Sequence, residues 1–218
     1  MVNREEQVYW VIGYGSLIHP DSLRRTVPHI EVDQIRLVRV VGYRRLFNLA
    51  SMEAWNSAMP LRQSAAVLNV EVDSEAEFGG VAFPVGEGAL RALDQREYMY
   101  KRITGVKCEE FTTGEPVYRS ILYSALSGEE LRLQKKSFYK KCVQPLGLES
   151  LICKEILPID MYLSLCLQGV FGWSDQFGSH FVENTYLGDG VTSLSEFLSE
   201  DEIRGRLDLD IVDYIQHR

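Results

Sequence analysis

The sequence predicts an α+β protein, in which a mixed, mostly antiparallel sheet closes into a small barrel surrounded by helices. Residues 8–125 support the sheet, because apolar segments of strand length are joined by short turns and one helical segment is inserted. From residue 127 to 218, charged and apolar segments of helical character predict a helical layer. No linker rich in Pro, Gly or Ser separates the two parts, so we expect a single domain over residues 1–218.

The composition argues against several classes of protein. The chain has 218 residues, of which 45% are hydrophobic, so it can bury a substantial core. Its net charge of −8 is unfavourable for nucleic acid or an anionic membrane, since both require a basic surface. No apolar segment approaches the roughly 20 residues that span a bilayer, and the polar N-terminus does not resemble a signal peptide. We expect a cytoplasmic protein and leave open whether it forms a homodimer.

The first part of the chain predicts four strands and one short helix. The second strand should bend near Gly42, because a glycine inside a strand often marks a bulge. Residues 73–77 are acidic and predict a hairpin-like connection. Residues 51–63, which include Trp55, predict a long loop, and such loops in compact domains are usually functional. The expected strands are residues 8–12, 34–49, 65–72 and 78–85, and the helix is residues 22–26.

The next segments predict one helix between strands and then the helical layer. Gly86 and Gly88 end the strand pattern and precede the helix. The expected elements are a helix at residues 89–97, strands at 100–111 and 117–125, helices at 129–143, 160–171 and 176–185, and helix-forming residues from Ser193 onward.

Glu97 occupies an unusual position in the predicted helix. Leu90 and Leu93 lie on one apolar stripe, and position 97 continues that stripe. A carboxylate that faces the core is costly unless it is paired or protonated, and burial raises its pKa toward the range that suits proton transfer. The alternative is that the helix ends before Glu97, which then pairs with Arg96 or Arg102 at the surface.

The strand at residues 8–12 leads into a turn that could bind a ligand. The turn consists of Tyr14, Gly15, Ser16 and Leu17. Gly13 and Gly15 carry no side chains, so backbone N–H groups can approach a carboxylate or an oxyanion closely. The dinucleotide fingerprint fails because Ile18 replaces its third glycine, and the spacing around Ser16 does not fit a nucleophile elbow. The alternative is a plain tight turn after a buried strand.

The sequence offers no ligand set for a metal or cofactor. The four histidines and four cysteines show no metal-ligand spacing and no CxxC pair, so we expect no cofactor and a reduced, intracellular environment. Tyr14, Tyr98 and Tyr100 could donate hydrogen bonds to a small polar substrate, although single tyrosines are more often core or rim residues.

Several motifs resemble the gamma-glutamylcyclotransferase family, including its glutathione-specific members. The motifs are VYWVIGYGSLIHP at 8–20, VVGYRRLFN at 40–48, SAAVLNVE at 64–71, FGGVAFPV at 78–85, LDQREYMYKR at 93–102, PIDMYLSLCLQG at 158–169 and NTYLGDG at 184–190. The resemblance implies that the turn of Tyr14, Gly15, Ser16 and Leu17 holds the glutamyl part of a substrate. It also implies that Glu97 is the general acid/base and that Tyr100 lines the pocket. No cofactor is implied.

The implied reaction converts a γ-glutamyl amide into pyroglutamate and a free amine or amino acid. The substrate's own α-amine would be the nucleophile, so Ser16 would bind substrate through its backbone. Two alternatives remain open. One is a non-catalytic module of the same fold that binds a small acidic ligand or a protein partner. The other is a cyclotransferase that acts on a γ-glutamylated biosynthetic intermediate, because nothing in the sequence selects among γ-glutamyl substrates.

Overall fold

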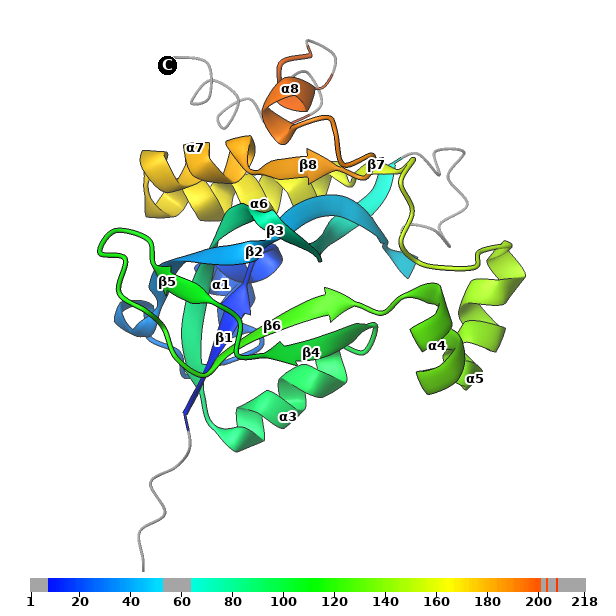
Figure 1. Ribbon diagram of the computed structural model, residues 1–218, viewed down its shortest axis with the longest axis horizontal. Helices are drawn as coiled ribbons and strands as arrows, with labels where there is room; N and C mark the ends of the chain where they lie inside the picture. Colours follow the sequence, from blue (N-terminus) through cyan, green and yellow to red (C-terminus); the bar gives the residue numbers. More distant parts are fainter. Residues whose placement is uncertain (1–7, 53–63, 201–202, 204–206, 208–218) are drawn as a thin grey trace, which may run out of the picture.

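The computed structural model describes residues 8–52, 64–200, 203 and 207, and these form an eight-stranded mixed sheet with helices around it (Figure 1). The strands are β1 (Tyr9–Gly13), β2 (Arg36–Ala50), β3 (Ser64–Val85), β4 (Tyr100–Thr104), β5 (Cys108–Glu110), β6 (Ser120–Ala125), β7 (Leu157–Pro158) and β8 (Thr185–Leu187). The helices are α1 (Pro20–Arg24), α3 (Glu87–Arg96), α4 (Gly128–Gln134), α5 (Lys136–Phe138), α6 (Asp160–Trp173), α7 (Asp175–Glu183) and α8 (Leu194–Leu198). Most of the predicted loop, including Trp55, lies outside the described residues.

The prediction of a mixed, mostly antiparallel sheet is confirmed, but the predicted barrel is wrong. The strand order is β4-β6-β1-β3-β2-β5, with β7 beside β3 and β8 beside β2. Strands β4 and β5 lie at opposite ends of this order, and no pairing between them occurs among the described strands. Among the described strands, the three-residue β5 pairs with β2 and β4 pairs with β6, so the two ends of the order do not meet and the sheet stays open. The segment predicted as one strand over 100–111 is therefore two strands, separated by Gly105.

Strands β2 and β3 form a long bent ribbon rather than separate short strands. Val41 pairs with Glu77 and Tyr43 pairs with Val72, so Gly42 alone faces residues 73–76. Gly42 has a φ of 87°, which glycine adopts without a steric penalty. The predicted bend is confirmed at this point. The predicted hairpin at residues 73–77 is wrong, because β2 pairs with β3 on both sides of the segment and keeps it within the sheet as a bulge.

The helices cover the sheet with their apolar faces. Helices α6 and α7 pack against each other and against β3, while α3 lies at the opposite end of the molecule in the view of Figure 1. One hydrophobic cluster joins strand residues such as Phe47 and Phe83 to helix residues such as Leu167 and Phe181. The predicted helix over residues 129–143 is interrupted, because α4 ends at Gln134 and the backbone is π-helical from Tyr139 to Val143. Within the described parts of the chain, no helix has the length and apolarity needed to cross a membrane.

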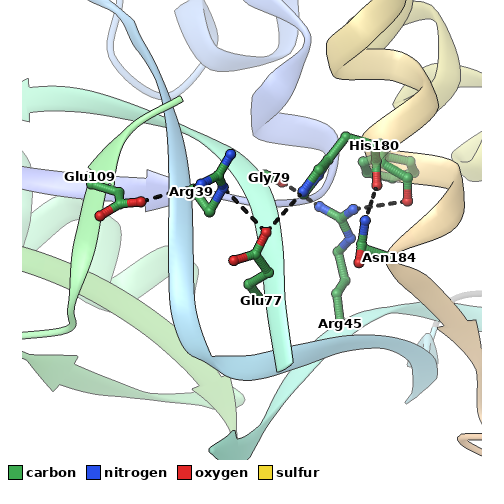
Figure 2. Close-up of polar contacts among 8 residues, drawn as sticks. Arg39, Arg45, Glu77, Gly79, Glu109, His180 and Asn184 are labelled. Carbon is green, nitrogen blue, oxygen red and sulfur yellow. Dashed lines mark hydrogen bonds and ion pairs between the residues drawn. The ribbon is translucent and has the colours of Figure 1, made fainter. Parts of the chain in front are cut away.

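A buried arginine, Arg45, ties the sheet to the helical layer. Its Nε donates a hydrogen bond to the Thr185 hydroxyl at 2.8 Å, and its two terminal nitrogens donate to the carbonyls of Gly79 at 2.6 Å and Phe181 at 3.1 Å. Figure 2 shows the side chain reaching from β2 toward Gly79 and α7. The guanidinium carbon also lies 3.7 Å from the ring centroid of Phe181. Desolvation lowers the Arg45 pKa to about 9, so the group remains charged at neutral pH.

Replacing Arg45 with alanine is expected to destabilise the protein by about 3 kcal/mol or more, because three buried hydrogen bonds are lost and a cavity remains. The free energy of unfolding in urea measures this effect. Arg44→Ala is the matched control, since Arg44 is partly exposed and its carboxylate contacts with Glu71 and Asp73 are 3.9 Å long. The control should lose less than about 1 kcal/mol. Equal losses in the two variants would contradict a central role for Arg45.

Candidate active site

A small cavity brings the candidate residues from the sequence together. Its volume is about 240 Å³, slightly below the range of roughly 300–1,000 Å³ that is typical of ligand pockets. The turn after β1, the C-terminal end of α3, the first half of β3 and helix α6 line it. The predicted site residues in its wall are Tyr14, Gly15, Ser16, Leu17, Glu97 and Tyr100. The cavity has room for a small ligand or for one end of a larger one.

The turn after β1 is tight because two glycines lack side chains. Gly13 ends β1, and a Cβ placed there would lie 2.8 Å from the Cβ of Leu17. A short 3₁₀ helix, η1 (Ser16–Ile18), follows at once, and the N–H of Ile18 donates to the carbonyl of Gly15 at 2.9 Å. The first N–H groups of such a helix have no partner within it. The turn therefore forms one wall of the cavity and has backbone N–H groups that need partners from outside η1.

Tyr162 of α6 lies over this turn and was not among the candidates from the sequence. Its hydroxyl forms hydrogen bonds with the backbones of Ser16 and Leu68. A Cβ on Gly15 would collide with that hydroxyl oxygen. The sequence suggested that Gly15 makes room for a ligand, but in the structure Gly15 makes room for Tyr162. The cavity wall at this point is thus formed by the turn and the Tyr162 hydroxyl together.

Two contacts along α6 bring Tyr162 to the turn. A Cβ on Gly169 would lie 2.9 Å from the backbone nitrogen of His19, so the glycine permits the close approach of the helix. At the end of α6, the indole nitrogen of Trp173 donates to the carbonyl of Ile18 at 3.0 Å. The helix is therefore held against η1 along its length. In the sequence, Tyr162 is marked by its hydroxyl in a mostly apolar helix and by its place in the motif at residues 158–169.

Glu97 combines features of both alternatives drawn from the sequence. Helix α3 ends at Arg96, and Glu97 is its C-cap, with its N–H donating to the carbonyl of Leu93 at 2.7 Å. Arg96 Nε lies 3.5 Å from the Glu97 carboxylate, as the surface alternative proposed, whereas Arg102 pairs with Asp94 at 3.1 Å. The Glu97 side chain is nevertheless only 18% exposed and lines the cavity. Burial raises its pKa, and the nearby Arg96 opposes this shift in part.

The tyrosines divide into two groups. The Tyr14 hydroxyl donates to the carbonyl of Tyr123 at 2.7 Å, and the Tyr100 hydroxyl donates to that of Leu68 at 3.3 Å. Burial raises the pKa of both Tyr14 and Tyr100, so both remain protonated donors at neutral pH. Tyr98 is 39% exposed and packs on the ring of Phe138, with 5.2 Å between centroids. The suggestion that Tyr98 belongs to the site is therefore wrong, because it faces α5.

The arrangement is suited to proton transfer on a small polar ligand. A mostly buried carboxylate with a raised pKa shares a cavity with backbone groups and phenol hydroxyls. Burial moves the pKa of such a carboxyl group toward the range in which it can accept and return a proton. In the described part of the chain, no group of three His, Cys, Asp or Glu residues is placed to hold a metal ion.

Replacing Glu97 with glutamine is expected to stabilise the protein at neutral pH. Burial raises the Glu97 pKa above its usual value of 4.5, so the folded state binds this proton more tightly than the unfolded chain. The resulting stability is present below pH 4.5 and is lost as the pH rises through the raised pKa. The urea midpoint of Glu97→Gln should exceed that of the natural protein at neutral pH, and the difference should vanish toward pH 4. Glu87→Gln, on the exposed start of α3, should show no such gain.

A double-mutant cycle tests the contact between Gly15 and Tyr162. Gly15→Ala is expected to cost about 1–3 kcal/mol, because the added methyl group must displace the Tyr162 hydroxyl. In a Tyr162→Phe background the loss should be smaller, since the Cζ atom of the ring lies 3.4 Å from the added Cβ. Unfolding free energies of the four proteins give the coupling. Strictly additive losses would show that the two residues do not interact in this way.

No protein-family model and no curated protein match this chain. Among the solved structures that are similar to this chain, two illustrate its fold. YkqA from Bacillus subtilis is 15% identical with a TM-score of 0.55, and the match covers 82% of this chain and 54% of that one. A gamma-glutamyl cyclotransferase is 13% identical with a TM-score of 0.51, and the match covers 97% of this chain and all of that one. This chain spans about half the length of YkqA and has the fold of a gamma-glutamyl cyclotransferase.

Proposed function

We propose that this protein is a γ-glutamyl cyclotransferase that releases pyroglutamate and an amine or amino acid from a small γ-glutamyl compound. The observation that carries the proposal is the mostly buried Glu97 carboxylate, which shares one small cavity with the turn of residues 14–17. The fold shared with a gamma-glutamyl cyclotransferase supports this choice of reaction. A protein that only bound a small anion would gain nothing from a carboxylate in the same cavity.

Substrate binding would depend on the turn and the residues around it. Backbone N–H groups of the turn that are not already bonded to the Tyr162 hydroxyl would donate hydrogen bonds to the glutamyl carboxylate or to the amide oxygen as it gains charge. Tyr14, Leu17 and Tyr100 would form the surrounding wall. A cavity of this size would hold the glutamyl chain bent, so that its α-amine meets its own γ-carbonyl carbon.

The chemistry would need one group that carries a proton in both directions. Glu97 would take a proton from the substrate's α-ammonium group, and the freed amine would attack the γ-carbonyl carbon to form a five-membered ring. As the tetrahedral intermediate expels the leaving nitrogen, Glu97 would return the proton to it, and the ring nitrogen would release its second proton, which the free amine takes up through water. The new C–N bond closes pyroglutamate, and the broken C–N bond releases the amine. Burial raises the pKa of Glu97, which favours this exchange.

The buried thiol nearest to the cavity wall is unsuited to covalent catalysis. Cys166 of α6 is fully buried, and desolvation raises its pKa to about 12, although Arg45 and Tyr162 oppose the shift. A thiol with this pKa is protonated at neutral pH and is a poor nucleophile. Attack by the substrate's own amine is therefore the simpler route. In this route the Ser16 hydroxyl would not be needed as a nucleophile.

The decisive experiment is pyroglutamate release from glutathione, γ-glutamyl dipeptides and γ-glutamyl amines, measured by chromatography. Glu97→Gln should reduce kcat at least about a hundredfold, because the variant cannot accept the proton. Circular dichroism checks that the variant is folded. Glu87→Gln is the control, because Glu87 lies on the same helix but is exposed and paired with Arg91 at 2.6 Å. It should keep full activity.

The outcomes separate the alternatives. Unchanged turnover in Glu97→Gln would overturn the assignment of Glu97. Tight binding of a γ-glutamyl compound without product would indicate a binding module of the same fold. Product from none of the small compounds, but from a larger γ-glutamylated intermediate, would indicate a biosynthetic cyclotransferase.

A further inference from the structure

An open recess lies beside the Glu97 cavity and shares one residue with it. Its volume is about 480 Å³, and it is lined by Ser22, Arg25, Thr26, Ala92 and Arg96. Arg96 also lines the smaller cavity, where it adjoins Glu97. The recess is thus formed between the end of α1 and the last turns of α3, on the side of the cavity where Glu97 lies.

The recess carries positive charge that acidic side chains of the described residues neutralise only in part. Arg25 is exposed, and no acidic side chain of the described residues lies within 4.0 Å of its guanidinium. Asp21, the acidic residue of α1, pairs instead with Arg24 at 3.1 Å. Arg96 is 40% exposed and approaches only the Glu97 carboxylate among the described acidic groups, at 3.5 Å. Two guanidinium groups therefore line one recess on a chain whose net charge is −8.

Hydroxyl groups accompany the two arginines. Ser22 and Thr26 both line the recess, and the buried Oγ1 of Thr26 has no hydrogen-bond partner among the described residues. Guanidinium groups bind carboxylates with two parallel hydrogen bonds, and hydroxyls can supply further donors. Two guanidinium groups with nearby hydroxyls are complementary to a negatively charged carboxylate. The two arginines would repel a protonated amine.

We propose that Arg25 and Arg96 form a subsite for a carboxylate on the leaving part of the γ-glutamyl substrate, an inference that rests on the proposed function. Glu97 returns a proton to the leaving nitrogen, so the leaving group departs from the cavity beside Glu97. Arg96 is the next residue and joins the cavity to the recess. A leaving amino acid would place its carboxylate near the two arginines, whereas a simple amine has no carboxylate that they could bind. The protein should therefore prefer γ-glutamyl amino acids and peptides to γ-glutamyl amines.

The test compares γ-glutamyl-alanine with γ-glutamyl-alaninamide. In the second compound a neutral carboxamide replaces the carboxylate of the leaving group. The natural protein should show a kcat/KM about ten- to a hundredfold higher for the acid, as expected for one or two charge-assisted hydrogen bonds. Arg25→Gln should abolish most of this preference by raising KM for the acid, with little effect on the amide. Arg24→Gln is the matched control. It removes the same charge from the neighbouring position, which faces Asp21, and should keep the preference.

Equal kcat/KM values of the natural protein for the acid and the amide would overturn the proposed subsite. Equal losses of kcat/KM on both compounds in Arg25→Gln would also overturn it. Release of no pyroglutamate from either compound would defeat the proposed reaction instead. The subsite would then be judged by calorimetric binding of the same two compounds. A preference for the acid that Arg25→Gln removes would support it, and equal or absent binding of both would overturn it.

Discussion

The buried guanidinium of Arg45 is the interaction on which much of the structure depends. It joins β2 to the carbonyls of Gly79 in β3 and Phe181 in α7 and to the hydroxyl of Thr185 in β8. No carboxylate of the described residues neutralises it, so backbone carbonyls and the face of Phe181 compensate for its lost hydration. A buried cation satisfied in this way tolerates little movement of its partners. The sheet and the helical layer are therefore held in one relative position.

That fixed position is what assembles the cavity. Helix α6 packs against α7 on one side and against the turn after β1 on the other, and Tyr162 lies where α6 meets the turn. Arg45 is also close enough to Tyr14 and Cys166 to influence their pKa values. The packing contacts that hold the wall of the cavity are thus also contacts of the protein core. Glu97, in contrast, stands at a helix end, where a C-cap residue can be partly buried without disturbing the sheet.

The cavity and the recess give different surroundings, and different proposed roles, to two adjacent residues. Glu97 and Arg96 are neighbours in the chain, but Glu97 is mostly buried while Arg96 is 40% exposed. Burial raises the pKa of the first, and exposure leaves the second free to meet a charged group from solvent. A helix that ended one turn later would direct the two side chains differently. The C-cap at Glu97 is therefore central to both the proposed chemistry and the proposed specificity.

Some of this could be predicted from the sequence, because it depends on local spacing. Glu97 continues the stripe of Leu90 and Leu93, and the turn after β1 is marked by its glycines, so both candidates were evident. The hairpin expected at residues 73–77 was wrong because acidic residues are common both in turns and in bulges, and only the pairing with β2 distinguishes them. The barrel was wrong because closure depends on whether two distant edge strands meet, and here the ends of the strand order do not. The sequence by itself determined that a carboxylate and a glycine turn were available. Only the tertiary structure decided that Tyr162 covers Gly15 and that Arg25 and Arg96 line one recess, because contacts between distant segments follow from packing and not from local periodicity.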